Sequence, residues 1–140
     1  MAKVLFHGPW DQDELSCSRI TQEWIESIVL SHGLKLGSLN INLVDDDSLL
    51  SINRQHLDHD YYTDIITFEY SRYPRIKGEL WISFDRVKEN AQAHKVGYSE
   101  EMARVVAHGV LHLCGFGDKD PNELAIMRKE EDKALILRAL

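Results

Sequence analysis

Two histidines, a glycine and an aspartate have the spacing of a metal site that begins on a helix. His108 and His112 are four residues apart, so on an α-helix both imidazole rings lie on one face and can reach a common ion. Gly115 can leave the helix with a positive φ and turn the chain back. Asp118 can then supply a third ligand. The pattern predicts a tetrahedral site whose fourth position is open for water, as in catalytic zinc sites.

Imidazole and carboxylate ligands together suit zinc, although nickel, iron and manganese accept the same donors. We therefore expect one Zn²⁺ per chain, with the water that it binds as the reactive group. Cys114 follows His112 by two residues and falls on a different face of the helix, so we do not expect it to be a ligand. His56 and His59 are the remaining candidates for a fourth metal ligand from outside this stretch. A fourth protein ligand would favour a structural metal over a catalytic one.

The composition indicates one domain with its own core. The chain has 140 residues, 44% of them apolar, which suffices for one core but not for two ordinary domains. It has neither an apolar run long enough to span a membrane nor a secretory signal at its start, so we expect a cytoplasmic protein. Cys17 and Cys114 lie in helical patterns and are predicted to be buried thiols rather than a disulfide.

A basic segment interrupts a chain that is acidic overall. The formal net charge of −7 argues against a general nucleic-acid coat protein, because such proteins need a basic surface. Residues 71–77, however, contain Arg72, Arg75 and Lys77 together with a tyrosine. We predict that these cations contact RNA; the alternative is a solvated loop between strands.

The elements that must position these residues follow from hydrophobic periodicity and from turn and cap residues. Asp46 or Asp47 is expected to cap the helix that follows the second strand. Together the elements predict an α+β domain over residues 1–140, with about four strands in a mixed sheet and about five helices. The expected strands are 2–7, 39–44, 63–70 and 78–84, and the expected helices are 13–32, one from about 47 to 57, 85–95, 99–113 and 121–140.

Read with residues 63–68 (Thr-Asp-Ile-Ile-Thr-Phe) and 78–83 (Gly-Glu-Leu-Trp-Ile-Ser), the metal stretch resembles the YbeY family of bacterial metal-dependent endoribonucleases. The resemblance extends from about Asn40 to the C-terminus. It implies a zinc-dependent hydrolase that cuts phosphodiester bonds in single-stranded RNA, on a fold related to zinc-dependent proteases. It also implies a role in rRNA maturation, at the 3′ end of the small-subunit rRNA, and in ribosome quality control, with rRNA and the ribosome or its proteins as partners.

The resemblance places the family's three metal ligands on His108, His112 and Asp118. The third ligand is more commonly histidine in the family. A carboxylate adds negative charge, so we expect the metal-bound water to be less acidic than with three imidazoles. The family commonly has a functional arginine just before its Thr-Asp strand, but Leu57 occupies the aligned position. Arg54 lies one helical turn earlier and is our candidate replacement.

For an endonuclease, we expect the scissile phosphate to lie over the ion, which polarises a phosphate oxygen. Arg54 or the basic segment would then stabilise the charge that develops on phosphorus. Attack by a 2′-hydroxyl remains open beside attack by metal-bound hydroxide. The candidates for a general base are Asp64, Glu79 and Asp120.

Two other functions compete with the nuclease. A metallopeptidase of similar histidine spacing has glutamate as general base directly after the first histidine, where this chain has Gly109. A non-catalytic ribosome assembly factor with a structural metal is favoured by the acidic balance and by the absence of the family arginine. It is disfavoured because only three ligands can be assigned.

Overall fold

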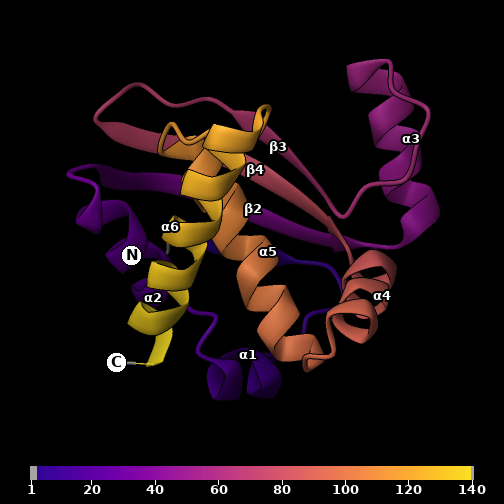
Figure 1. Ribbon diagram of the computed structural model, residues 1–140, viewed down its shortest axis with the longest axis horizontal. Coiled ribbons are helices and arrows are strands. Elements are labelled where there is room, and N and C mark those ends of the chain that lie inside the picture. The colour runs from indigo at the N-terminus through magenta and orange to yellow at the C-terminus, as the bar shows by residue number, and fades with distance from the viewer. Residues whose placement is uncertain (1–2, 140) are drawn as a thin grey trace.

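A mixed sheet of four strands forms the centre of the structure, a computed structural model that describes residues 3–139. β2 pairs in parallel with both β1 and β4, and β3 pairs antiparallel with β4. β3 therefore lies at an edge of the sheet (Figure 1). In spatial order the strands are β1 (Val4–His7), β2 (Lys35–Val44), β4 (Arg75–Ser83) and β3 (Ile65–Glu69).

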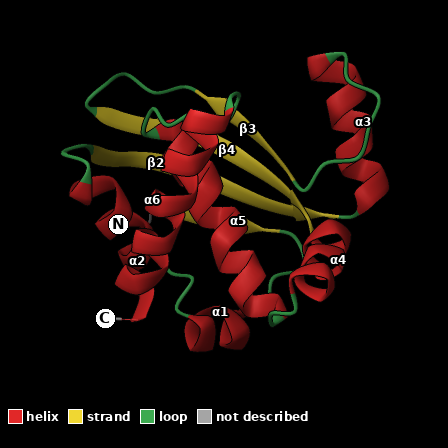
Figure 2. Cartoon of the chain, viewed as in Figure 1, coloured by secondary structure: helices red, strands yellow, loops and turns green. Residues whose placement is uncertain are grey.

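One face of the sheet carries the hydrophobic core. In β2 the buried residues Leu39, Ile41 and Leu43 alternate with the partly exposed Asn40 and Asn42, because successive side chains of a strand point to opposite faces. Helix α5 packs on β3 and β4 over the buried face, α2 lies beside it, and α6 packs over both helices (Figure 2). The helices are α1 (Gln12–Ser18), α2 (Gln22–Ser31), α3 (Asp46–Leu57), α4 (Phe84–His94), α5 (Tyr98–Leu113) and α6 (Pro121–Ala139).

The α+β class and the four-stranded mixed sheet are confirmed, but the helix expected over residues 13–32 is two helices. Arg19 adopts a left-handed conformation (φ 57°), and the side chain of Thr21 accepts a hydrogen bond from the Trp24 backbone N–H to begin α2. The described chain therefore has six helices rather than five. The prediction of a buried Cys17 is also wrong, because the short helix α1 buries only Leu15 and leaves the Cys17 side chain exposed.

Several element boundaries differ from the predicted ones. β4 begins at Arg75, so Arg75 and Lys77 belong to a strand rather than to a loop. Asp45, not Asp46 or Asp47, caps α3, and the carboxylate of Asp46 binds Ser83 and Arg86 instead. The predicted ends at residues 2 and 140 lie outside the described residues. Within residues 3–139, none of the helices combines the length and the apolar character needed to cross a bilayer.

Candidate metal centre and its pocket

Helix α5 brings the two histidines to one wall of a pocket. The face of the helix that meets the core is apolar, and Val106, Val110 and Leu111 on it are fully buried. The helix ends as predicted: Gly115 has a φ of +105°, and the Phe116 backbone N–H donates to the Leu111 carbonyl at 3.1 Å. The chain then turns back along α5, which brings the side chain at position 118 to the histidines.

The three predicted ligand atoms form a nearly equilateral triangle. Nε2 of His108 lies 3.1 Å from Nε2 of His112 and 3.2 Å from Oδ2 of Asp118, and the third side measures 3.3 Å. A tetrahedral ion with bonds of about 2.0–2.1 Å separates its ligands by about 3.3–3.4 Å. The donor types and their spacing therefore fit one zinc-sized ion. The structure shows the cluster and does not identify the metal.

A buried glutamate, which the sequence analysis missed, supports the first ligand. Glu131 in α6 is 2% exposed, and its Oε2 lies 2.7 Å from Nδ1 of His108. Its other oxygen accepts hydrogen bonds from Arg104 and Arg128. Burial alone would raise the pKa of Glu131, but the hydrogen bonds from His108 and Arg104 outweigh it and lower that pKa. A signal was present, because Glu131 occupies the same helix face as the buried Met127 and Ala134.

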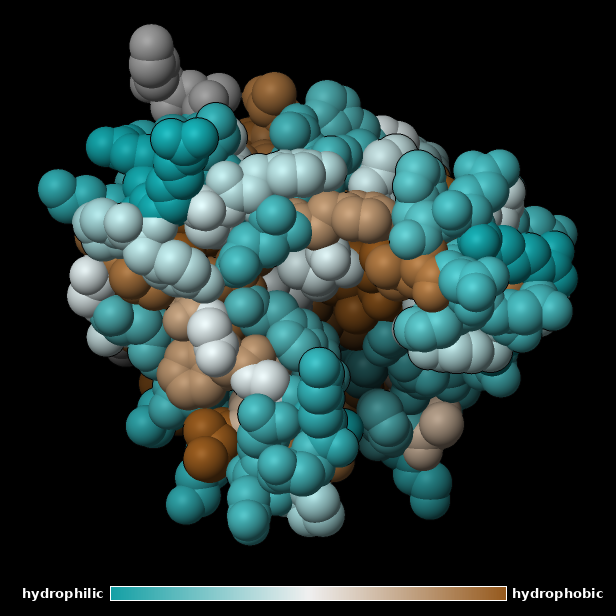
Figure 3. All heavy atoms as spheres, turned by 90° about the horizontal axis from the view of Figure 1, so that it is seen from above, coloured by the Kyte–Doolittle hydropathy of each residue, from teal (hydrophilic) through white to brown (hydrophobic). Residues whose placement is uncertain are grey.

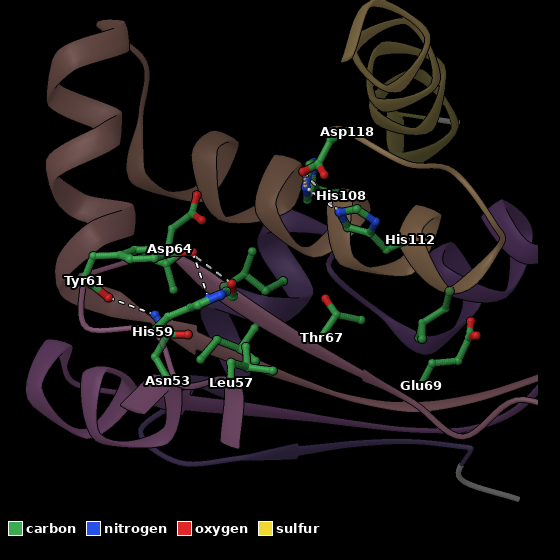
Figure 4. A pocket seen from close by; sticks show the side chains of 14 residues that line it. Asn53, Leu57, His59, Tyr61, Asp64, Thr67, Glu69, His108, His112 and Asp118 are labelled. Atoms are coloured by element: carbon green, nitrogen blue, oxygen red, sulfur yellow. Dashed lines mark hydrogen bonds and ion pairs between the residues drawn. The ribbon is translucent and has the colours of Figure 1, made fainter. Parts of the chain in front are cut away.

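The metal cluster opens onto a pocket of about 440 Å³. Helix α3 and the loop after it form one wall, β3 forms the floor, and α5 with residue 118 forms the opposite wall (Figure 4). Seen from above, the molecule is hollowed near the centre, with hydrophobic side chains at the floor and hydrophilic ones around them (Figure 3). The lining residues are Asn53, Leu57, His59, Tyr61, Thr63, Asp64, Ile65, Ile66, Thr67, Glu69, His108, His112, Leu113 and Asp118.

Of the three candidates for a general base, only Asp64 lines this pocket. Burial raises the pKa of its carboxyl group, and the charge of His108 opposes that shift. Asn90 donates a hydrogen bond of 3.3 Å to its Oδ2. Glu79 instead accepts a hydrogen bond from Tyr70, and Asp120 accepts one from the Glu123 backbone N–H in the first turn of α6.

The other nitrogen and sulfur candidates do not join the cluster within the described chain. His56 packs edge-on against Phe68, and His59 stacks on Tyr61. Cys114 is half-buried, and burial together with the charge of Glu69 raises the pKa of its thiol to about 11.

The candidate arginine is engaged in an ion pair. Arg54 forms an ion pair with Asp60 and is not among the lining residues, whereas Leu57 lines the pocket and is 40% exposed. Arg72, Arg75 and Lys77 are largely exposed and also lie outside the lining. Their segment lies against the end of α5 through Tyr73, whose hydroxyl oxygen is 2.9 Å from both the Leu113 carbonyl oxygen and Oε2 of Glu69.

Gly109, which occupies the position of the peptidase glutamate, lies close to the sheet. A Cβ atom at this position would lie 2.8 Å from side-chain atoms of both Ile65 and Leu80. The position after His108 therefore packs closely against the sheet, and a larger side chain there would have to displace Ile65 and Leu80.

The family assignment rests on the length of the match as well as on this site. The sequence model of the family described as Endoribonuclease YbeY matches residues 10–138. The chain belongs to the YbeY family. Membership supports endoribonuclease activity and agrees with the resemblance seen in the sequence motifs.

Relatives and a solved structure agree with this assignment. The chain is 47% identical over 120 residues to Endoribonuclease YbeY of Bacteroides thetaiotaomicron, a match that covers 86% of this chain and 88% of the relative. It is 40% identical to the YbeY protein of Porphyromonas gingivalis over 98% of this chain and 91% of the other. A solution structure from Thermotoga maritima superposes with a TM-score of 0.65 at 28% identity, covering 96% and 88% of the two chains.

Proposed function

We propose that this YbeY-family protein is a zinc-dependent endoribonuclease that cuts single-stranded RNA in the cytoplasm. Its proposed roles are maturation of the 3′ end of small-subunit rRNA and ribosome quality control, with rRNA and the ribosome as partners. The observation that carries the proposal is the triangle of His108, His112 and Asp118 on the wall of an open pocket. Three protein ligands beside a pocket are typical of a catalytic metal, since structural zinc commonly has four.

A bound Zn²⁺ would supply Lewis acidity toward a phosphate oxygen and would make a bound water more acidic. His108, His112 and Asp118 would hold it, and Glu131 fixes the orientation of the His108 ring. Asp64 lies in the same pocket with a raised pKa, so its carboxyl group can exchange a proton closer to neutral pH than an exposed aspartate can.

The charge of the pocket makes binding of RNA depend on the metal. Its lining contains Asp64, Glu69 and Asp118 but, within residues 3–139, neither arginine nor lysine. Without a cation these carboxylates repel a phosphodiester. The metal therefore provides the attraction for the scissile phosphate, while the basic segment at residues 71–77 is proposed to hold the strand farther along.

The test is cleavage of an unstructured single-stranded RNA by protein purified without chelator, with the bound metal quantified. Wild type, His108→Ala, metal-stripped protein and stripped protein with added zinc are compared. His7→Ala is the matched control, because His7 is an exposed histidine on β1. We expect cleavage to disappear with the metal, to return with zinc and to persist in the control. Equal traces of cleavage in all samples, together with bound metal, would instead indicate an assembly factor with a structural ion.

A further inference from the structure

We propose that the ring of Tyr61, backed by His59, is a stacking surface for an unpaired base of the RNA strand that enters the metal pocket. The inference rests on the proposed function and adds the substrate feature that the pocket recognises. Both side chains line the pocket on the wall that faces the metal cluster (Figure 4).

The two rings already form a stack. Their centroids are 5.1 Å apart at an interplanar angle of 22°, and the Tyr61 hydroxyl group lies 2.9 Å from Nδ1 of His59. Tyr61 is 56% exposed, so much of its ring remains open to solvent. An exposed aromatic ring on a pocket wall offers a planar surface that a flat ligand can cover.

The loop that carries this pair is anchored from below. Asn53 is 1% exposed, and its side-chain amide donates to the Tyr61 carbonyl at 2.9 Å. The His59 backbone N–H donates to the Asn53 carbonyl at 3.2 Å. A buried polar side chain thus holds the loop, and the ring is placed before any ligand binds, which lowers the entropic cost of binding.

The neighbouring tyrosine is engaged elsewhere. The guanidinium group of Arg86 lies 4.8 Å from the centroid of the Tyr62 ring, and the Tyr62 hydroxyl group donates to Asp47. Tyr70 and Tyr73 are exposed, but they bond to Glu79 and Glu69 and lie outside the pocket lining. Among the exposed tyrosines of the described chain, Tyr61 alone lines the pocket.

An unpaired nucleobase is the occupant that fits a nuclease pocket with such a wall. Every base presents a π-face, so stacking on an aromatic side chain tolerates any sequence. Bases within a duplex are already stacked on their neighbours and are not free to bind the ring, whereas bases in single strands are. Stacking on Tyr61 would thus favour single-stranded over paired substrates without base-specific hydrogen bonds.

The experiment measures the affinity of the metal-loaded, full-length protein for a fluorescent 12-nucleotide single-stranded RNA, under conditions where gels show that the RNA stays intact. Tyr61→Ala removes the ring, and Tyr61→Phe keeps the ring but loses the hydroxyl group. Tyr70→Ala is the matched control, since Tyr70 is 57% exposed outside the pocket. Each protein is also titrated with RNAs that carry one abasic nucleotide, moved stepwise along the strand.

We expect Tyr61→Ala to weaken binding about 5- to 150-fold, the range for loss of one stacked base. Tyr61→Phe and Tyr70→Ala should bind like wild type. Removal of the base at one position of the RNA should weaken binding by the wild type. The same removal should not further weaken binding by Tyr61→Ala. Equal affinities of wild type and Tyr61→Ala would overturn the proposal, and so would a loss that persists with every abasic RNA. Failure of the proposed function is distinct, because wild type itself would then not cleave RNA with zinc.

Discussion

Glu131 Oε2 lies 2.7 Å from Nδ1 of His108, and this contact joins α6 to the face of α5 that carries the two histidines. The carboxylate accepts a hydrogen bond from Nδ1–H, which leaves the lone pair of Nε2 directed at the other two atoms of the cluster. The relationship sets the tautomer of His108 before a metal binds.

Glu131→Gln should weaken zinc binding about 10- to 100-fold, the usual effect of altering a carboxylate behind a ligating histidine. The amide preserves the volume of the side chain but removes its charge. Competition with a chelating indicator measures the affinity. Glu130→Gln, its neighbour on α6, pairs with His32 and Lys133 instead and is the control. Equal zinc affinities of both variants would show that Glu131 only packs the helices together.

The stability of the metal-free protein should depend on pH through the protonation of His108. Burial opposes its charged form, but the hydrogen bond with Glu131 and the nearby carboxylates outweigh burial and raise its pKa above 6.5. Because the folded-state pKa is the higher one, protonated His108 stabilises the fold below the unfolded value. This contribution is lost as the pH rises through the folded pKa.

Zinc displaces the same proton, so zinc affinity should increase with pH through this range. Titration of the His108 ring by NMR gives its pKa in the folded protein. Zinc affinities measured between about pH 5.5 and 8.5 then show whether the affinity increases through that pKa. An affinity that stays constant across the range would contradict the linkage.

Asp118→His should keep the metal and shift the pH optimum of cleavage lower. A third imidazole removes one negative charge from the ligand set, so the group that must lose a proton at the site becomes more acidic. Metal content and pH–rate profiles of both proteins test this. Asp120→His places the same change two residues away, directly before the start of α6, and should leave the optimum unchanged.

Replacing Arg72, Arg75 and Lys77 by alanine should weaken RNA binding and reduce its dependence on salt. Each phosphate contact in a single strand contributes about 0.7 to the slope of log affinity against log salt, so the slope should fall by up to about 2. Affinities at several salt concentrations give this slope. The control replaces three exposed helical lysines, Lys88, Lys129 and Lys133. An unchanged slope would mean that this segment is solvated and does not contact the RNA.

Gly109→Ala should destabilise the fold by about 1–3 kcal/mol, because the added methyl group overpacks the contact between α5 and the sheet. Urea unfolding of the metal-free protein measures the loss. Gly97→Ala is the matched control, since a Cβ there meets nothing within 4 Å and its φ is −70°. Similar effects of both changes would mean that the contact yields without cost.

Features that depend on residues close together in the chain could be predicted from the sequence. The i, i+4 spacing of His108 and His112, the glycine that ends their helix and the return of Asp118 are local, so the clustering of these three side chains could be predicted. Periodicity likewise gave the four strands and most of the helices. The break at Arg19 was missed because apolar residues continue across it at helical spacing.

Features that depend on contacts between distant segments could be seen only in the folded structure. Glu131 reaches His108 from 23 residues away because α6 packs on α5, and no local pattern specifies that approach. Arg54 was expected at the pocket from helical spacing, but Asp60 in the following loop pairs with it outside the lining. Tyr61 lines the same pocket as His108 and His112 because α3 and the loop after it stand across β3 from α5. Local spacing fixes which side chains share one face, whereas the packing of elements fixes which faces meet.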